Sequence, residues 1–231
     1  MPTVLAFDVY GTLIDTHGVV VKLQKFVGDT AEEFSRVWRE KQLEYSFRRG
    51  LMRTYENFGV CTSQALDYTN AYLGTRLSTD HKAKLLAEYR CLPAFDDVKE
   101  SLVRLKADGH SLYAFSNGTA DAVETLLATA GIRDLFDGVV STDDRQTFKP
   151  NPDVYEHLLK KTSTSAGDAW LISSNPFDVI GAVSYGLRSA WVQRSKDSIF
   201  DPWGIEPTHT ITSLRELASR ITNSRAAPEA G

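Results

Sequence analysis

The sequence is poor in cysteine and has no long hydrophobic segment. Only Cys61 and Cys91 occur among its 231 residues, too few for a disulfide framework. No apolar run approaches the roughly 18 residues that a membrane-spanning helix requires. The amino-terminal residues also lack the basic and apolar regions of a secretory signal. These absences predict a cytoplasmic protein with reduced thiols and no membrane partner.

Basic charge is not in excess, and the histidines do not follow the spacing of a metal site. The formal net charge is −4, whereas nucleic-acid-binding proteins usually carry a basic surface, so we expect no nucleic-acid partner. The hydrophobic content of 42% and charged content of 24% are ordinary for a globular protein. We expect no metal and no other cofactor. Structural or solvated roles are expected for the five histidines, which are His17, His81, His110, His157 and His209.

The stretch from Val4 to Leu13 begins with an apolar, partly β-branched run that is typical of a buried strand in a parallel sheet. This strand delivers one carboxylate, Asp8, to its carboxyl end, where open α/β sheets bind their ligands. Gly11 then permits a sharp turn, because glycine adopts a positive φ without steric cost. Asp8 is therefore a candidate functional residue, although an aspartate here could equally cap a turn.

Residues 15–91 change character and form a predicted helical insertion. Aromatic and apolar residues such as Phe34, Trp38 and Tyr45 recur at helical spacing, and no alternating strand pattern occurs. Gly18 and Pro93 punctuate the two hinges of the insertion. We therefore expect a helical cap domain over residues 15–91, a core domain formed by residues 1–14 and 92–224, and a disordered tail over residues 225–231.

After the insertion, helices alternate with strands. The pattern predicts strands at 111–116, 136–141, 169–173 and 189–192, and helices at 97–108, 120–130, 152–161, 176–185 and 213–223, the last capped by Ser213. Strands alternating with helices imply right-handed βαβ units. The expected fold class is α/β, a Rossmann-like parallel sheet flanked by helices with an inserted helical cap.

Polar residues follow four of the predicted strands. They are Asp8 and Thr12 after the first strand, Ser116-Asn117-Gly118-Thr119 after the second, Lys149 beyond the third, and Ser173-Ser174-Asn175 with Asp178 after the fourth. Any one of these groups alone is more often a turn than a site. Together they bring a nucleophile, small polar donors, a cation and a second carboxylate to one edge of the sheet.

This order of residues resembles the haloacid dehalogenase superfamily over nearly the whole chain. Most members are magnesium-dependent phosphatases, which carry a second aspartate two residues after the nucleophile. Here that position is Tyr10, which supplies no carboxylate. The aspartate that helps the phosphatases bind magnesium is also missing from the stretch that begins at Ser173, although a magnesium site favours such oxygen ligands. The resemblance therefore implies a metal-free site for a singly charged substrate.

Within the superfamily, the chain is most similar to the L-2-haloacid dehalogenases. The similarity lies in Asp8-Val9-Tyr10-Gly11-Thr12-Leu13, in Trp38-Arg39-Glu40-Lys41-Gln42-Leu43-Glu44-Tyr45, in Ser116-Asn117-Gly118, in Lys149-Pro150 with Tyr155, and in Ser173-Ser174-Asn175-Pro176-Phe177-Asp178. Two positions depart from the family pattern. Phe177 stands where some members carry tryptophan, and Glu40 stands where some relatives carry a neutral amide.

The resemblance implies hydrolysis of small (S)-2-haloalkanoic acids to (R)-2-hydroxyalkanoic acids, with haloacetate as a further substrate, and a homodimer. Asp8 is the implied nucleophile, oriented by Thr12, and attacks through an aspartyl ester. The resemblance further implies that the halide is bound by Arg39, Asn117 and Phe177, and the substrate carboxylate by Ser116 and the amides of Tyr10, Gly11 and Thr12. Lys149, positioned by Tyr155, would neutralise the carboxylates, and Asp178 with Ser173 and Asn175 would orient or deprotonate the water. The implied apolar wall consists of Tyr10, Leu43, Phe58 and Phe177.

Other functions stay open at the level of sequence. One alternative is a magnesium-dependent phosphatase of the same superfamily that works without the second aspartate. Another is a non-catalytic member that binds a small carboxylate or a protein, although burying unused polar groups costs free energy. A phosphonate-cleaving member would need a cap lysine such as Lys41 to form a Schiff base, and nothing near Lys41 in the sequence indicates a perturbed amine.

Overall fold

A computed structural model describes residues 3–226 and contains one six-stranded parallel sheet. The strands are β1 (Val4–Phe7), β2 (Ser111–Ser116), β3 (Gly138–Ser141), β4 (Ala169–Ser173), β5 (Arg188–Val192) and β6 (His209–Ile211). Their order in the sheet is β3-β2-β1-β4-β5-β6, and every neighbouring pair is parallel. All carboxyl ends therefore lie at one edge, and the expected α/β fold is confirmed.

Strand β1 lies in the middle of the sheet because its side chains are apolar on both faces. Leu5 and Phe7 pack into one hydrophobic cluster, while Ala6 between them packs into another on the opposite face. The alternation of side chains along a strand explains this division. β1 pairs with β2 on one side and with β4 on the other, so Asp8 follows a strand that is fixed from both sides.

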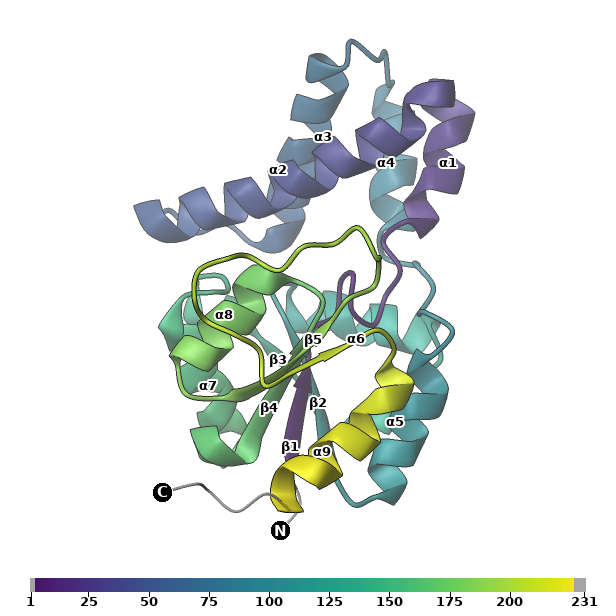
Figure 1. Ribbon diagram of the computed structural model, residues 1–231. Helices are drawn as coiled ribbons and strands as arrows, with labels where there is room; N and C mark the ends of the chain where they lie inside the picture. Colours follow the sequence, from purple (N-terminus) through teal and green to yellow (C-terminus); the bar gives the residue numbers. More distant parts are fainter. Residues whose placement is uncertain (1–2, 227–231) are drawn as a thin grey trace.

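Helices cover both faces of the sheet (Figure 1). α7 (Pro152–Thr162) and α8 (Pro176–Ser184) pack on the face of Ala6, whereas α5 (Val98–Ala107), α6 (Ala120–Thr129) and α9 (Leu217–Ala226) pack on the opposite face. Each helix follows a turn at the edge of the sheet. The amino ends of α6 and α8 consequently lie at the edge where the polar residues gather.

Four helices follow β1 and lie beyond the carboxyl ends of the strands (Figure 1). They are α1 (Gly18–Val27), α2 (Ala31–Met52), α3 (Phe58–Tyr72) and α4 (Thr79–Glu88), and we call them the cap helices. Residues 15–91 contain no strand, as expected. Apolar residues of α1, α2 and α4 pack in the same cluster as Leu5 and Phe7, so the cap helices cover the edge that carries the polar residues.

The carboxyl-terminal part differs from expectation in two places. Strand β6 was not expected, because its three residues include the polar His209 and Thr210; it extends the sheet by pairing with β5. Ser213 does form the expected cap, with Glu216 completing a capping box. Helix α9 continues to Ala226, past the expected end at residue 223. Residues 225 and 226, expected in the disordered tail, therefore belong to this helix, and residues 227–231 of that tail lie outside the described residues.

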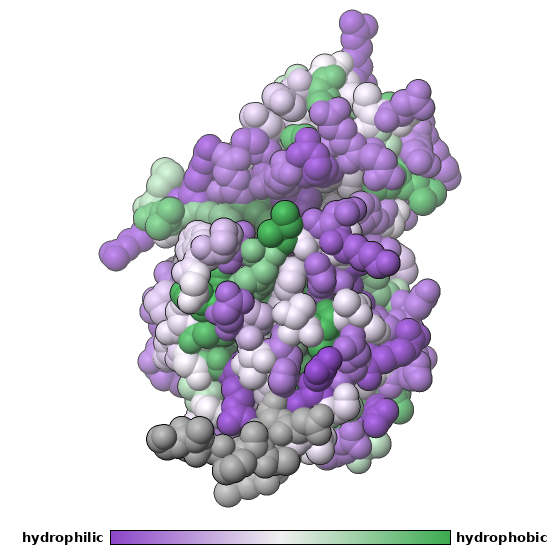
Figure 2. All heavy atoms as spheres, viewed as in Figure 1, coloured by the Kyte–Doolittle hydropathy of each residue, from purple (hydrophilic) through white to green (hydrophobic). Residues whose placement is uncertain are grey.

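Polar and charged side chains cover most of the visible surface (Figure 2). Hydrophobic atoms appear at the end of α2, where Leu51 and Met52 are 86% and 68% exposed. Ile199 and Trp203, in the loop between β5 and β6, are also exposed. None of the helices within residues 3–226 combines the length and apolar composition that a membrane span requires.

Candidate active site

Asp8 lies directly after β1 and is only 7% exposed. The chain turns back at Gly11, whose φ is +84°, and this turn places Thr12 beside the carboxylate. The Thr12 hydroxyl donates to Asp8 Oδ2 at 2.8 Å. Because the same hydroxyl accepts the N–H of Ser174 at 2.8 Å, its proton is directed toward Asp8. The turn that follows β1 therefore fixes the orientation of the carboxylate.

A buried ammonium lies between two carboxylates. Lys149 is 1% exposed, and its Nζ donates to Asp8 Oδ1 at 3.2 Å and to Asp178 Oδ2 at 2.8 Å. The third donation goes to the carbonyl of Phe115 at 2.8 Å. All three ammonium hydrogens are therefore used, and one positive charge is shared by the two carboxylates.

Asp178 is fully buried on the first turn of α8. Burial raises the pKa of its carboxyl group, and Lys149 acts in the opposite direction. The Tyr155 hydroxyl donates to Asp178 Oδ1 at 2.9 Å. Tyr155 was expected to position Lys149; its hydroxyl instead contacts Asp178, so any effect on Lys149 passes through that carboxylate.

Gly181 makes room for this contact. A Cβ at position 181 would overlap the Tyr155 hydroxyl and lie 2.6 Å from Pro150 Cβ. Since real Cβ atoms do not approach other atoms so closely, a larger residue at position 181 would displace α7 from α8. A glycine within a predicted helix usually has such a packing reason, and this signal was present in the sequence.

The loop after β4 supplies the second hydrogen bond to Asp8. Asn175 Nδ2 donates to Asp8 Oδ2 at 2.8 Å, and the Ser173 hydroxyl accepts the backbone N–H of Asn175 at 3.1 Å. Oδ2 thus receives two hydrogen bonds at 2.8 Å, counting the one from Thr12, whereas Oδ1 receives one at 3.2 Å. Oδ1 is the less encumbered oxygen and hence the better nucleophile of the two.

Ser116 ends β2 and Asn117 follows it, and each has a hydrogen-bond donor that no described residue accepts. The Asn117 side-chain oxygen accepts hydrogen bonds from the backbone N–H of Lys149 at 3.0 Å and from the Thr142 hydroxyl at 3.3 Å. This fixes the amide, while its Nδ2 donates to no residue that the structure describes. The Ser116 hydroxyl accepts the Gly118 N–H at 3.1 Å, and its own proton is likewise not donated within residues 3–226. Both side chains can therefore donate to an anion.

Two of the backbone amides expected to bind the substrate carboxylate are already engaged. The N–H of Gly11 donates to the Ile14 carbonyl at 2.9 Å, and that of Thr12 to the Val9 carbonyl at 3.4 Å. Both bonds belong to the turn after β1. This leaves the amide of Tyr10 and the hydroxyl of Ser116 as the donors for a carboxylate on this side.

The cap helices contribute a guanidinium. Arg39 on α2 is partly buried, and its Nη2 lies 3.4 Å from the carbonyl oxygen of Tyr10. Its Nη1 lies 3.4 Å from Gln42 Oε1. No carboxylate of the described residues is within ion-pair distance of Arg39, whereas Glu40 next to it pairs with Arg36 on the exposed side of α2 at 2.8 Å. The positive charge of Arg39 is thus not neutralised by a neighbouring carboxylate of the described residues, and it can attract an anionic ligand.

Aromatic rings from both parts of the molecule meet beside this guanidinium. The ring of Tyr10 lies 6.2 Å from that of Phe58, and the ring of Phe177 lies 5.0 Å from that of Phe47 on α2. Leu43 is partly buried on α2, one turn after Arg39. Phe177 and Tyr10 therefore touch the cap helices directly, and Leu43 faces the same way as Arg39.

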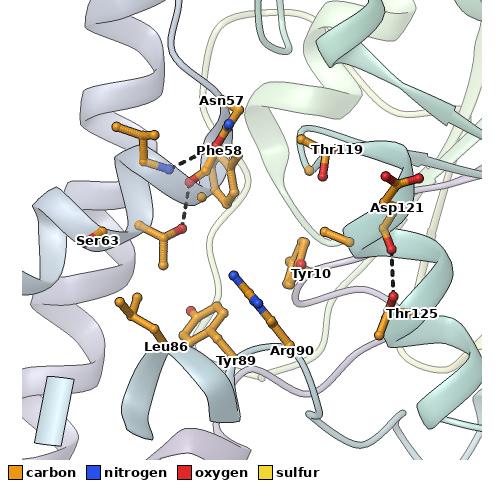
Figure 3. Close-up of a pocket in the computed structure, with 15 residues that line it drawn as sticks. Tyr10, Asn57, Phe58, Ser63, Leu86, Tyr89, Arg90, Thr119, Asp121 and Thr125 are labelled. Carbon is orange, nitrogen blue, oxygen red and sulfur yellow. Dashed lines mark hydrogen bonds between the residues drawn. The ribbon is translucent and has the colours of Figure 1, made fainter. Parts of the chain in front are cut away.

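A cavity of about 600 Å³ opens between the cap helices and α6 (Figure 3). Of the expected site residues, only Tyr10 and Phe58 line it, and the side chain of Arg90 extends into it. Burial raises the pKa of Tyr10 to about 12, so its phenol stays neutral and cannot replace a catalytic carboxylate. Tyr10, which lies in the turn after Asp8, is thus the residue by which this turn borders the cavity.

The carboxylates of the site are held by protein donors. Across residues 3–226, no three side chains of His, Cys, Asp or Glu converge as metal ligands would. The cation between the two carboxylates is Lys149. Lys41, the lysine considered for a Schiff base, donates to Glu44, and this hydrogen bond raises the pKa of the amine. A raised pKa is the opposite of what Schiff-base formation requires.

The contacts of three further residues were not expected from the sequence. Ser174 binds both Thr12 and the Gly11 carbonyl. Arg194, in the loop after β5, donates to the Thr12 carbonyl at 2.6 Å and to both oxygens of Asp97 at 2.8 Å. Gln42 contacts Arg39 from the same helix. Ser174 and Arg194 have no local signal, because their partners come from segments far apart in the sequence. The spacing of three residues between Arg39 and Gln42 on a predicted helix is a local signal that could have indicated the third contact.

Comparison with known proteins gives one consistent result. The family described as haloacid dehalogenase-like hydrolase matches residues 5–192. The chain is 35% identical over 227 residues to an (S)-2-haloacid dehalogenase from Pseudomonas sp. (strain YL), covering 98% of this chain and 97% of that protein. It is 33% identical over 217 residues to haloacetate dehalogenase H-2 from Moraxella sp. (strain B), covering 94% and 96%.

Solved structures give the same result. The L-2-haloacid dehalogenase from Xanthobacter autotrophicus superimposes with a TM-score of 0.88 at 30% identity, covering 96% of this chain and 99% of that chain. The same protein with chloropropionic acid covalently bound aligns equally well. The similarity thus extends over the sheet, the cap helices and the polar edge between them.

Proposed function

The chain belongs to the haloacid dehalogenase-like hydrolase family, and we propose that it hydrolyses small (S)-2-haloalkanoic acids to (R)-2-hydroxyalkanoic acids. The observation that carries this proposal is Asp8, a buried carboxylate whose Oδ2 is held by Thr12 and Asn175 while its Oδ1 faces only Lys149. Tyr10 occupies the position at which the phosphatases carry their second aspartate. The site is thus equipped for carboxylate attack and lacks the usual group for phosphoryl transfer.

In the first step, Asp8 Oδ1 attacks C2 of the substrate from the side opposite the halogen. The new bond joins Oδ1 to C2, and the electron pair of the carbon–halogen bond leaves with the halide. Backside attack inverts the configuration at C2 and gives an aspartyl ester. Holding both groups in line converts a reaction between two molecules into one within a complex, which is what the fixed carboxylate provides.

The halide leaves toward the cap helices. The Arg39 guanidinium has no carboxylate partner among the described residues, and the Asn117 Nδ2 is fixed but not used. Donors aimed at the atom where negative charge develops stabilise the transition state most strongly. We assign halide binding to these two groups with Phe177, and binding of the substrate carboxylate to the Ser116 hydroxyl and the Tyr10 amide.

In the second step, water attacks the carbonyl carbon of the Asp8 ester. The bond between that carbon and the ester oxygen breaks, so the oxygen stays on C2 and the product keeps the inverted configuration. Asp178, whose pKa is raised by burial, takes one proton of the water, which Ser173 and Asn175 orient, and passes it to the oxygen that leaves the acyl carbon. The carboxylic acid that forms on Asp8 loses its remaining proton to solvent. Once Asp8 is esterified, it no longer competes for Lys149, and the ammonium stabilises Asp178 alone.

We assign the entry of the substrate to the cavity beside Tyr10, the residue two positions after Asp8 (Figure 3). Tyr10, Phe58, Leu43 and Phe177 form the wall for the alkyl group, which stays small because the rings of Tyr10 and Phe58 already lie 6.2 Å apart. Haloacetate, which has no alkyl group at C2, fits the same site. The relative from Moraxella carries the name of a haloacetate dehalogenase.

The cap helices form a domain of their own in this proposal, over residues 15–91, and the protein is a cytoplasmic homodimer. The exposed Leu51 and Met52 at the end of α2 supply apolar surface for a partner. Cys61 and Cys91 are unpaired, in keeping with a reducing compartment. Sedimentation velocity tests the dimer: a single species of 25.7 kDa at micromolar concentration would contradict it.

The test of the proposed function compares two reactions in one preparation. Halide release is measured from the separate enantiomers of 2-chloropropionate in the presence of a chelator, and phosphate release from a generic phosphate ester with magnesium. We expect chloride from the (S)-enantiomer alone, unaffected by the chelator. Phosphate release without chloride would support the phosphatase instead.

Two variants complete this test. Asp8→Asn removes the nucleophile and should abolish chloride release, while Asp15→Asn, in the same loop, serves as the matched control and should retain it. Chloride release by Asp8→Asn at a rate near that of the unmodified protein would contradict the mechanism. No release of either product by the unmodified protein would favour the non-catalytic carboxylate-binding member.

A further inference from the structure

Gln42 is a fully buried amide that lies next to the proposed halide site. It follows Arg39 by three residues on α2, so both side chains lie on the same face of the helix. Its Oε1 accepts from Arg39 Nη1 and from the Tyr89 hydroxyl, each at 3.4 Å. One amide oxygen thus links the guanidinium to a residue at the end of α4.

The other half of this amide is unsatisfied. Gln42 Nε2 is buried and has no hydrogen-bond partner among the residues that the structure describes. Buried polar groups are normally paired, and an unpaired donor costs stability. A methionine or leucine of similar size would avoid that cost. The amide at position 42 is therefore explained by what its oxygen does and not by packing.

The oxygen orients a cation without neutralising it. Three other basic residues of α2 have carboxylate partners: Arg36 pairs with Glu40, and both Lys41 and Arg48 pair with Glu44. Arg49 donates to the neutral oxygens of Thr54 and Gln64, but on the exposed surface. Arg39 has no carboxylate partner within residues 3–226, and its contacts are two neutral oxygens, those of Gln42 and the Tyr10 carbonyl. A carboxylate in place of the Gln42 amide would form an ion pair and reduce the attraction of Arg39 for an anion.

Tyr89 anchors this arrangement from the other side. Its ring lies 4.9 Å from that of Trp38 and 6.2 Å from that of Tyr10. Burial raises the pKa of Tyr89, so its hydroxyl remains a donor at neutral pH. Gln42 therefore connects α2, the end of α4 and the residue two positions after Asp8.

We propose that Gln42 is a positioning residue that holds the Arg39 guanidinium over the reacting carbon as a free cation for the departing halide. This inference rests on the proposed function, because it assigns the halide to Arg39. Gln42 itself does not touch the halide in this account. Its effect is on the orientation of the Arg39 guanidinium and on the positive charge that the guanidinium offers to the halide.

The experiment uses Gln42→Met and Gln42→Glu, with Gln64→Met as the matched control. Gln64, on α3, also accepts from an arginine, Arg49 at 3.0 Å, but on the exposed surface of the cap helices. We expect Gln42→Met to keep or raise the Tm, because it removes the unpaired amide, and to lower kcat/KM for (S)-2-chloropropionate about tenfold through misplacement of Arg39. Gln64→Met should change neither.

Leaving-group dependence separates positioning from a structural role. The ratio of kcat/KM for the bromo to the chloro substrate should rise in Gln42→Met, because chloride depends more on the donor. Chloride binding to the free protein, measured by NMR line broadening without turnover, should weaken in Gln42→Met and be lost in Gln42→Glu. If the unmodified protein binds chloride but releases none from substrate, the proposed function fails. If the unmodified protein releases chloride from substrate but chloride binding is unchanged in Gln42→Met, this inference alone fails.

The inference is overturned by either of two results. One is chloride binding and a bromo-to-chloro ratio in Gln42→Met equal to those of the unmodified protein. The other is a fall in activity that follows a fall in Tm, which would make Gln42 a packing residue. Should Gln42→Glu fail to fold, Tyr89→Phe provides a second variant: it removes one donor to Gln42 Oε1 and should weaken chloride binding by a smaller factor.

Discussion

The two halves of the site are built in opposite ways. On the sheet side, Asp8, Lys149 and Asp178 are buried and joined by contacts of 2.8–3.2 Å. On the cap side, Arg39 and Gln42 meet through contacts of 3.4 Å, the cation has no carboxylate partner among the described residues, and one buried amide hydrogen is unused.

This difference corresponds to the two tasks of the reaction. A nucleophile works best when its orientation is fixed before the substrate arrives. The sheet side fixes Asp8 through its hydrogen bonds and through the ammonium of Lys149, which it shares with Asp178. A leaving anion needs donors that are not already satisfied, and the cap side supplies the cation among them, Arg39, beside the unused Asn117 amide of the sheet side. The ion pairs of the site are thus concentrated on the sheet side, and its unpaired charge on the cap side. The following substitutions test that division.

The largest effect is expected for Lys149→Met. Asp178 is fully buried and would lose its counter-charge, so we expect the free energy of unfolding to fall by about 3–5 kcal/mol. Activity should be lost as well. Urea denaturation measures the change, and the double variant Lys149→Met/Asp178→Asn should recover stability without recovering activity. A stable but inactive single variant would show that the pair is not what stabilises the sheet side.

Arg39→Gln should have the opposite profile. We expect kcat/KM to fall about 10²–10³-fold, the loss typical for removal of one transition-state donor, with little change in Tm because Arg39 makes no ion pair within residues 3–226. Arg36→Gln is the matched control, since its pair with Glu40 is exposed and exposed pairs contribute little. Loss of Tm in Arg39→Gln, in step with activity, would remove the distinction between the two halves.

Asp97→Asn tests the support behind Thr12. Burial raises the pKa of Asp97, but hydrogen bonds from Arg194, the Leu214 amide and Ser213 outweigh it and hold the pKa below its usual value. A depressed folded-state pKa gives stability that is present above the unfolded pKa of about 3.9 and is lost as pH falls through the folded pKa. The variant should therefore be less stable at pH 7 by about 1–3 kcal/mol.

The same variant should show a shallower loss of unfolding free energy on acidification. Urea denaturation at a series of pH values measures both effects. Equal slopes for Asp97→Asn and the unmodified protein below pH about 5 would contradict the assigned pKa. Activity should also fall, because Arg194 would no longer be held against the Thr12 carbonyl.

The smallest effect is expected for Tyr10→Phe. The Tyr10 hydroxyl donates to no residue that the structure describes, and its pKa of about 12 keeps it neutral at working pH. We expect kcat/KM to change by less than about threefold and the alkaline limb of the pH–rate profile to stay in place. An alkaline limb that moves in Tyr10→Phe would mean that this phenol takes part in proton transfer.

The fold was predictable wherever a pattern was local. The apolar run before Asp8 and the alternation of strands and helices after residue 96 predicted the parallel sheet. β6 was missed because three residues, two of them polar, carry no strand pattern; it forms only because β5 offers an edge. The end of α9 was also placed too early.

The site was predictable as a set of residues but not as a set of contacts. Asp8 follows β1, and Ser116 and Ser173 end its neighbours β2 and β4, so their meeting at one edge follows from topology. The partner of Tyr155 did not, because it depends on how closely α7 approaches α8 at Gly181. The contact of Gln42 with Tyr89 was not predicted, because it depends on the orientation of α2 relative to the end of α4. The contacts of Arg194 were not predicted, because it lies in a loop of irregular conformation.

A single turnover in heavy-oxygen water tests the central claim most directly. Protein is mixed in excess over (S)-2-chloropropionate, and the peptide that contains Asp8 and the released hydroxyacid are weighed by mass spectrometry. Attack by Asp8 predicts that heavy oxygen enters the Asp8 carboxylate and that the product carries ordinary oxygen. Heavy oxygen in the product and none in Asp8 would mean direct attack by water, and the account given for the sheet side would be wrong.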